Sequence, residues 1–176
     1  MEFMMVNASH SPILDFPARE SEAVVAVLAA LAETRDRIAA FGPDLVVLFG
    51  NDHYGGQQMS CMPSFCIGVE ATALADVGGT PGPLNVPRDL AIEAVSDLRD
   101  QGIDVAVSYD MKVDHGFSQA LTRLTGGLKT YPVLPIFMCC IQPPLSHSNG
   151  YVLWVTPLGS LFSASHGKSG SASESP

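Results

Sequence analysis

Three of the five histidines follow short apolar runs of the kind that form buried strands. His10 stands in NASHSP after FMMV, His53 in GNDHYGG after LVVLF, and His115 in KVDHGFSQ beyond IDVAVSY. In open parallel α/β sheets, ligands bind outside the carboxyl ends of the strands, so one layer of the fold could collect all three imidazoles. Imidazole nitrogens bind transition metals and exchange protons near neutral pH. The pattern therefore favours a metal site or an acid–base site at one edge of the sheet.

Each of these motifs also has a plain structural interpretation. A single histidine at a loop edge is commonly a solvated or hydrogen-bonded surface group. Ser9 and Ser11 could serve only to form a turn around His10. Asn51 and Asp52 could likewise be turn or cap residues. Asp114 could be no more than the N-cap of the helix that follows it. Spacing alone names neither the metal nor the reaction.

Other motifs are weak or absent. GGTPGP at 78–83 is glycine-rich but lacks the GxGxxG and GxxxxGK patterns of nucleotide-binding loops. The sequence contains no GxSxG elbow of an α/β-hydrolase. His147 and His166 each follow a serine, as His10 does, but neither has a strand and a helix predicted around it. We assign these features no function.

The elements that must position the three histidines alternate between strands and helices. The strands expected are FMMVN (3–7), LVVLF (45–49), short pieces around FCIGV within a loop-like stretch at 57–87, IDVAVSY (103–109) and PVLPIFMCCI (132–141). The helices expected span 20–41, about 88–101 and 116–127, where apolar residues recur at helical spacing and glycines follow. This order predicts an α/β fold with a mainly parallel sheet flanked by helices.

Composition limits the class of protein. At 176 residues, with 47% hydrophobic and 15% charged residues, the chain suits one compact soluble domain. Its formal net charge of -9 argues against nucleic acid and anionic membranes as partners. No run reaches the ~18 apolar residues of a spanning helix, and the start lacks the pattern of a secretory signal. Four cysteines without a CxxC pair indicate a reduced, cytoplasmic protein, and Cys139 and Cys140 are expected to be buried.

Five motifs, in order along the chain, resemble the type III (LigB-like) extradiol ring-cleavage dioxygenases. They are SHSP, PDLVVLFGNDHYGG, MPSFCIGVEATALADVGG, GIDVAVSYDMKVDHGFSQAL and YPVLPIFMCCIQPPL. The resemblance covers residues 1 to about 145 and is greatest to members acting on 2,3-dihydroxyphenylpropionate and 2,3-dihydroxycinnamate. It implies Fe(II)-dependent meta cleavage, by O2, of a catechol with a propionate or acrylate side chain in aromatic catabolism. It also implies a homo-oligomer.

The resemblance implies a role for each of the three histidines. His10 and His53 match the family's iron ligands, which with a glutamate hold a non-haem Fe(II). His115 matches the histidine that acts as proton donor. Iron binding would acidify the catechol and bring the ring and O2 together, and an imidazole could then supply a proton. Asp114 is expected to orient His115.

The sequence departs from the family after about residue 145. The family's second acid–base histidine, in a GGLSH-like motif, and its glutamate ligand lie further along, and neither motif occurs here. Residues 141–176 hold one acid, one base and nine serines, whereas the first 140 residues hold 17 acids and 8 bases. We therefore expect residues 1–145 to be the family-like, N-terminal half of the domain. Residues 146–176 are expected to be a non-homologous, frame-shifted, serine-rich tail that is partly disordered.

Two alternatives to an active dioxygenase stay open. The chain could be a truncated, non-catalytic member of the family that binds metal weakly, because two histidines lack preference for Fe(II). It could also be a metal-dependent hydrolase, with Asp52 or Asp114 as the base. Carboxylates that could in principle replace the missing glutamate, although the family does not use them so, are Glu70, Asp15 and Asp52. Cations that could face an anionic substrate are Arg88, Lys112 and Arg123.

Overall fold

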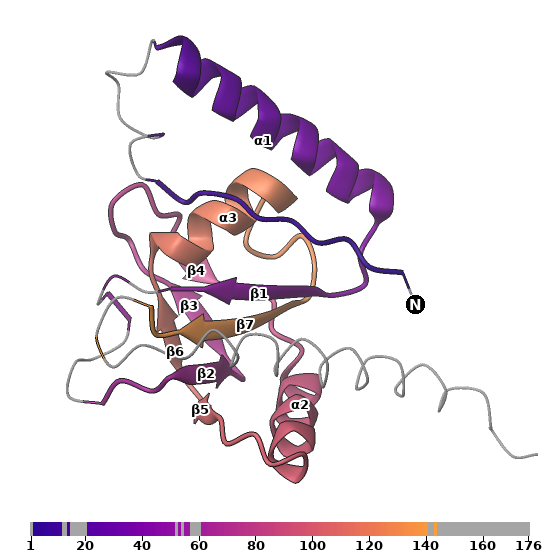
Figure 1. Ribbon diagram of the computed structural model, residues 1–176, viewed down its shortest axis with the longest axis vertical. Helices are drawn as coiled ribbons and strands as arrows, with labels where there is room; N and C mark the ends of the chain where they lie inside the picture. Colours follow the sequence, from indigo (N-terminus) through magenta and orange to yellow (C-terminus); the bar gives the residue numbers. More distant parts are fainter. Residues whose placement is uncertain are drawn as a thin grey trace, which may run out of the picture.

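The computed structural model describes residues 2–11, 14, 21–51, 53, 55–56, 61–140 and 143 (Figure 1). The elements in these ranges are α1 (Glu22–Phe41), β1 (Val46–Gly50), β2 (Phe65–Gly68), β3 (Ala71–Ala73), β4 (Gly82–Pro83), α2 (Arg88–Asp100), β5 (Ala106–Ser108), β6 (Met111–Val113), α3 (His115–Thr125) and β7 (Val133–Met138). The predicted boundary near 145 and the tail beyond it lie outside the described residues. None of the three helices is long and apolar enough to cross a membrane.

The described strands form two mixed sheets, with orders β1-β7-β2-β5 and β4-β3-β6. β1 pairs with β7, β2 with β5 and β3 with β6 in parallel, whereas β2–β7 and β3–β4 are antiparallel. With three helices around the sheets, the expected α/β class is confirmed. The division into two sheets was not anticipated from the sequence.

A bent ribbon of two parallel strands explains the division. β2 and β3 are separated only by residues 69–70, and β5 and β6 only by residues 109–110, so both strands bend at matching points. Their pairing continues through the bend, because the Val69 amide donates to the Ser108 carbonyl at 2.9 Å. The Met111 amide likewise donates to the Glu70 carbonyl at 2.9 Å. The ribbon therefore passes from one sheet into the other.

Helices cover both faces of the larger sheet. α2 lies against one face, while α3, with α1 packed on it, lies on the other (Figure 1). Alternate side chains of the central strand β7 accordingly enter different clusters: Leu134 and Ile136 pack with residues of α2, and Val133 and Phe137 with residues of α3. β2 and most of β7 are buried, as strands covered on both faces should be.

Local end signals set the bounds of α1. The Ser21 hydroxyl accepts a hydrogen bond from the Val24 amide at 3.3 Å, as an N-cap does. Gly42 adopts a left-handed φ of 62°, and its amide donates to the Ile38 carbonyl at 3.0 Å. The helix predicted over 20–41 is therefore confirmed to within two residues.

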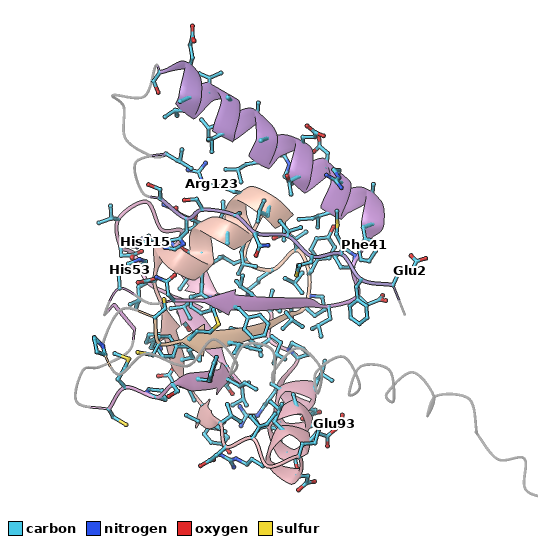
Figure 2. The ribbon with its side chains drawn as sticks, in the orientation of Figure 1. Glu2, Phe41, His53, Glu93, His115 and Arg123 are labelled. Carbon is cyan, nitrogen blue, oxygen red and sulfur yellow. The ribbon has the colours of Figure 1, made fainter. Side chains whose placement is uncertain are left out.

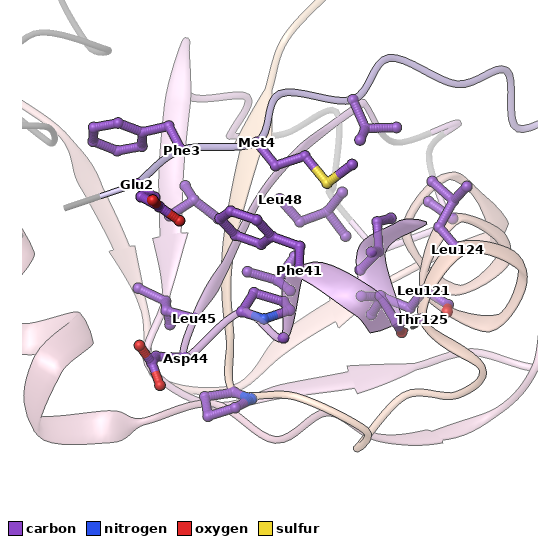
Figure 3. Close-up of a pocket in the computed structure, with 18 of the residues that line it drawn as sticks. Glu2, Phe3, Met4, Phe41, Asp44, Leu45, Leu48, Leu121, Leu124 and Thr125 are labelled. Carbon is purple, nitrogen blue, oxygen red and sulfur yellow. Dashed lines mark hydrogen bonds between the residues drawn. The ribbon is translucent and has the colours of Figure 1, made fainter. Parts of the chain in front are cut away.

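The amino-terminal segment differs from its prediction. FMMVN was expected to be a strand, but none of residues 2–11 belongs to one. The segment runs beside β1 (Figure 1), with Phe3 72% and Met5 87% exposed while Met4 and Val6 are half-buried. This alternation is typical of extended chain. The inward side chains line a cavity of about 830 Å³, shared with β1, α3 and the end of α1, in place of backbone pairing (Figure 3).

All four cysteines are free thiols. Cys66 and Cys139 are buried, whereas Cys61 and Cys140 are exposed, so the prediction that Cys140 is buried was wrong. Cys140 lies past the end of β7, where the chain leaves the covered sheet. Burial, with a smaller effect of Cys61, raises the pKa of the Cys66 thiol to about 11. Cys66 therefore stays protonated at neutral pH and packs as a small apolar residue in β2.

Candidate active site

The structure brings His10, His53 and His115 together. The distance between ring centroids is 5.0 Å for His10 and His53, 6.0 Å for His10 and His115, and 4.5 Å for His53 and His115. The last two rings are stacked, with 15° between their planes, and lie adjacent in Figure 2. Three imidazoles at this spacing form one polar cluster.

Different elements deliver the three rings. His53 follows the carboxyl end of β1, as the sequence predicted. His115 opens α3 directly after β6, a strand of the smaller sheet that was not anticipated, and is separated from β5 by the bend of the ribbon. His10 arrives on the extended amino-terminal segment. The cluster therefore depends on the packing of two sheets and not on one row of strand ends.

Asp114 anchors His53. Its carboxylate is 1% exposed, and one oxygen, Oδ1, accepts from the Gly116 amide at 2.8 Å, which makes Asp114 the N-cap of α3. The other oxygen, Oδ2, accepts from the His53 backbone amide at 2.5 Å and from its ring Nδ1 at 3.0 Å. The expectation that Asp114 orients His115 was wrong. Because Asp114 caps α3, its carboxylate lies over the first turn of the helix and faces the end of β1 and His53.

Asp76 does for His115 what Asp114 does for His53. Its Oδ2 accepts from the His115 backbone amide at 3.0 Å and from the ring Nδ1 at 2.6 Å. Asp76 lies in the loop between β3 and β4, and sequence reasoning missed it. The only available signal was an acid two residues before a Gly-Gly pair in LADVGG, which does not distinguish a functional carboxylate from a turn residue.

The remaining nitrogen of His53 faces His10. The two Nε2 atoms are 3.2 Å apart, and the Asn51 side-chain nitrogen lies 3.3 Å from the same His53 Nε2. Because a carboxylate only accepts, Nδ1 of His53 carries the proton, and Nε2 of the neutral ring is an acceptor within reach of the Asn51 side-chain N–H. Burial, then the neighbouring His53 and His115, lower the pKa of His10, which favours its neutral form; Asp114 opposes this shift.

Two donor sets could hold a divalent metal within the described residues. His53, Asp114 and His115 each offer a ligand atom, all within 4.8 Å of one another. Alternatively, His10 and His53 can bind through their facing Nε2 atoms. Metal–imidazole bonds of about 2.1 Å at angles of roughly 90–110° place two nitrogens about 3.0–3.4 Å apart, a range that includes the observed 3.2 Å. The geometry and chemistry of this pair therefore fit one metal ion.

Other residues named from the sequence lie elsewhere. Glu70 is exposed and ion-paired with Arg88, and Lys112 donates to Asp110 at 2.6 Å on the surface. Glu70 is thus engaged by a cation outside the histidine cluster. Asp15 and Asp52 lie outside the described residues. Arg123 is on α3, away from its first turn.

Gly116 permits the close approach that forms the cluster. A Cβ at this position would lie 2.6 Å from the Asn51 carbonyl oxygen and 3.0 Å from Asp114 Oδ1. We expect Gly116→Ala to lower the free energy of unfolding by about 1–3 kcal/mol, because the clash outweighs the better helix propensity of alanine. Urea denaturation followed by circular dichroism would measure this loss.

Gly127→Ala is the matched control for that substitution. Its Cβ would meet only the Thr130 hydroxyl, at 3.4 Å, which is ordinary contact. Equal stability of the two variants would show that α3 does not approach the end of β1 as closely as described.

Comparison with known proteins identifies the family. Residues 4–153 match the family described as the catalytic LigB subunit of aromatic ring-opening dioxygenase, and the chain belongs to that family. The matched residues extend beyond residue 145. The boundary expected near that residue, between a family-like half and a non-homologous tail, stays a prediction.

Curated relatives share nearly half of the aligned residues. The chain is 47% identical over 137 residues to the 2,3-dihydroxyphenylpropionate/2,3-dihydroxicinnamic acid 1,2-dioxygenase 2 of Pseudomonas putida. It is 48% identical over 137 residues to the enzymes named 2,3-dihydroxyphenylpropionate/2,3-dihydroxicinnamic acid 1,2-dioxygenase of two Escherichia coli strains, K12 / DH10B and SMS-3-5 / SECEC. Each alignment covers 78% of this chain and 44% of the relative, so the chain spans less than half the length of these proteins.

Proposed function

We propose that this chain carries two iron-ligating histidines, His10 and His53, and a proton-donating histidine, His115, of an extradiol dioxygenase. The reaction would be meta cleavage, by O2, of a catechol bearing a propionate or acrylate side chain. One observation carries the proposal: the Nε2 atoms of His10 and His53 face each other at 3.2 Å while buried Asp114 holds the opposite nitrogen of His53. The substrate class follows from the names of the relatives.

The hydrogen bonds of Asp114 favour the pair His10 and His53 over the alternative donor set. Metal-bound histidines characteristically donate their second ring N–H to a carboxylate, which fixes the ring and its tautomer. His53 has this partner in Asp114. Asp114 itself accepts three hydrogen bonds, so its role is to orient a ligand. A metal bound by Asp114 would have to displace some of them.

The residues of the chain then have distinct tasks. A ferrous ion held by His10 and His53 would acidify a catechol hydroxyl and unite the aromatic ring and O2 at one centre. His115 lies in reach of that centre, stacked on His53 at 4.5 Å. Its Nδ1 is engaged by Asp76, which leaves Nε2 to accept and return a proton.

A second candidate is metal binding without turnover. The donor set supports it: within the part of the chain that the structure describes, the two carboxylates beside the histidines, Asp114 and Asp76, each bond a histidine ring and its backbone amide. Two imidazoles bind divalent metals but do not select Fe(II) over its competitors.

An anaerobic loading experiment separates the candidates. The chain would be titrated with Fe(II) without oxygen, and binding measured by competition with a chelator. 2,3-Dihydroxyphenylpropionate and air would follow. Binding with a coloured ring-opened product supports the dioxygenase, and binding without colour supports the second candidate. Failure of the folded chain to bind Fe(II) would overturn the assignment of His10 and His53.

A further inference from the structure

We infer that Asp76 is a positioning residue for His115, fixing its imidazole with the proton on Nδ1 so that Nε2 is the nitrogen free to exchange protons. The role of His115 Nε2 in exchanging protons rests on the function proposed above, whereas the position of the ring proton does not. The tautomer is a property of the pair of residues and can be tested without turnover.

The contacts of Asp76 determine which ring nitrogen carries the proton. Its Oδ2 receives the His115 ring Nδ1 at 2.6 Å and the backbone amide of the same residue at 3.0 Å. A backbone N–H can only donate and a carboxylate oxygen only accepts, so the ring proton belongs on Nδ1. The His115 side chain is 9% exposed and that of Asp76 is 24% exposed, so the imidazole itself is largely shielded from water.

The loop around Asp76 is shaped to hold this carboxylate. The Gly79 amide donates to the Asp76 carbonyl at 3.1 Å and closes a tight turn. A Cβ at Gly79 would collide with Asp76 Oδ1, so the absence of a side chain there lets the carboxylate lie against the turn. Oδ1 is buried and, within the described residues, has no hydrogen-bond partner. The hydrogen bonds described for this carboxylate therefore converge on His115 through Oδ2.

The same arrangement of a carboxylate against a histidine occurs twice, which indicates that it serves the histidine cluster and not only the loop around Asp76. Both stacked rings, His53 and His115, have a carboxylate Oδ2 that bonds the ring Nδ1 and the backbone amide of the same histidine. Asp114 caps α3 through the Gly116 amide, and Asp76 accepts from the amide of His115, the first residue of the same helix. When neutral, both rings therefore have an unprotonated Nε2. That of His53 would bind a metal, and that of His115 would exchange a proton.

Nitrogen-15 NMR of the imidazoles tests the inference. Long-range proton–nitrogen correlation on the metal-free chain, at a pH where the rings are neutral, distinguishes the protonated from the unprotonated nitrogen. We expect Nδ1–H for His115 in the wild type. We expect Asp76→Ala, which removes the acceptor, to shift it toward the Nε2–H form. Asp76→Asn keeps an acceptor oxygen in the same place and should retain Nδ1–H. His53 should stay Nδ1–H in both variants because Asp114 is unchanged.

The exposed acid Asp104 provides the matched control, because Asp104→Ala removes the same charge away from the cluster. It should leave the tautomers of both histidines as in the wild type. Nε2–H in the wild type, or unchanged Nδ1–H in folded Asp76→Ala, would overturn the inference. Should Asp76→Ala fail to fold, the tautomer of the wild type alone decides.

Metal and activity measurements keep this inference separate from the proposed function. Fe(II) affinity should change less than about twofold in Asp76→Ala, because the hydrogen bonds described for the Asp76 side chain go to His115 and not to His10 or His53. If the wild type turns over, kcat of Asp76→Ala should fall on the order of 10–100-fold with KM nearly unchanged. A wild type without turnover but with the expected tautomers would remove the proposed reaction and leave the assignment of Asp76 intact.

Discussion

Replacing His53 with alanine is expected to lower the affinity of the chain for Fe(II) by at least about 100-fold. Loss of an orienting partner alone typically costs 10–100-fold in metal affinity, and this change removes the ligand itself. His53 is also common to both donor sets, since its ring faces His10 at 3.2 Å and belongs to the group with Asp114 and His115. Chelator competition under anaerobic conditions, with Co(II) as an air-stable substitute for Fe(II), would measure the loss.

His10→Ala distinguishes the two donor sets. If His10 and His53 form the site, this variant should lose about as much affinity as His53→Ala. If the metal lies among His53, Asp114 and His115, affinity should be unchanged, and our assignment would be wrong. His166→Ala removes a histidine outside the predicted set and should bind metal like the wild type. Unchanged affinity in His53→Ala would exclude both sites.

Replacing Phe117 with alanine should lower the free energy of unfolding by about 3–5 kcal/mol. Phe117 is 0% exposed and lies in the cluster between α3 and the sheets. Its ring sits directly on Gly50, where a Cβ would be 2.7 Å from Phe117 Cε2. The substitution would open a cavity beneath the end of β1, two residues from His115 in sequence. Domains are stable by roughly 5–15 kcal/mol, so this loss is a large part of the total.

Urea unfolding monitored by circular dichroism would give this difference, with Val25→Ala as the control. Val25 lies on α1 and is 60% exposed, so its truncation should change the free energy of unfolding by less than about 0.5 kcal/mol. A loss below 1 kcal/mol for Phe117→Ala would show that α3 is not docked on β1 through this ring.

Several features were readable from the sequence because their signals are local. Gly42–Pro43 marks the end of α1, and helical periodicity fills the residues before it. The run LVVLF gives β1 and places His53 just beyond its end. The N-cap role of Asp114 was weighed from its position ahead of the helix, and the structure shows that it caps α3. Each signal lies within a few residues of the element it specifies.

The partners of the histidines were decided only by the tertiary structure. Asp114 is adjacent to His115 in the chain but holds His53, 61 positions away, because Gly116 lets α3 approach the backbone at Asn51. Asp76 reaches His115 across 39 positions because a bent parallel ribbon joins β3 to β6. Sequence spacing contains no such distances. The residue types of the cluster were thus set locally, while the carboxylate that each ring meets was set by long-range packing.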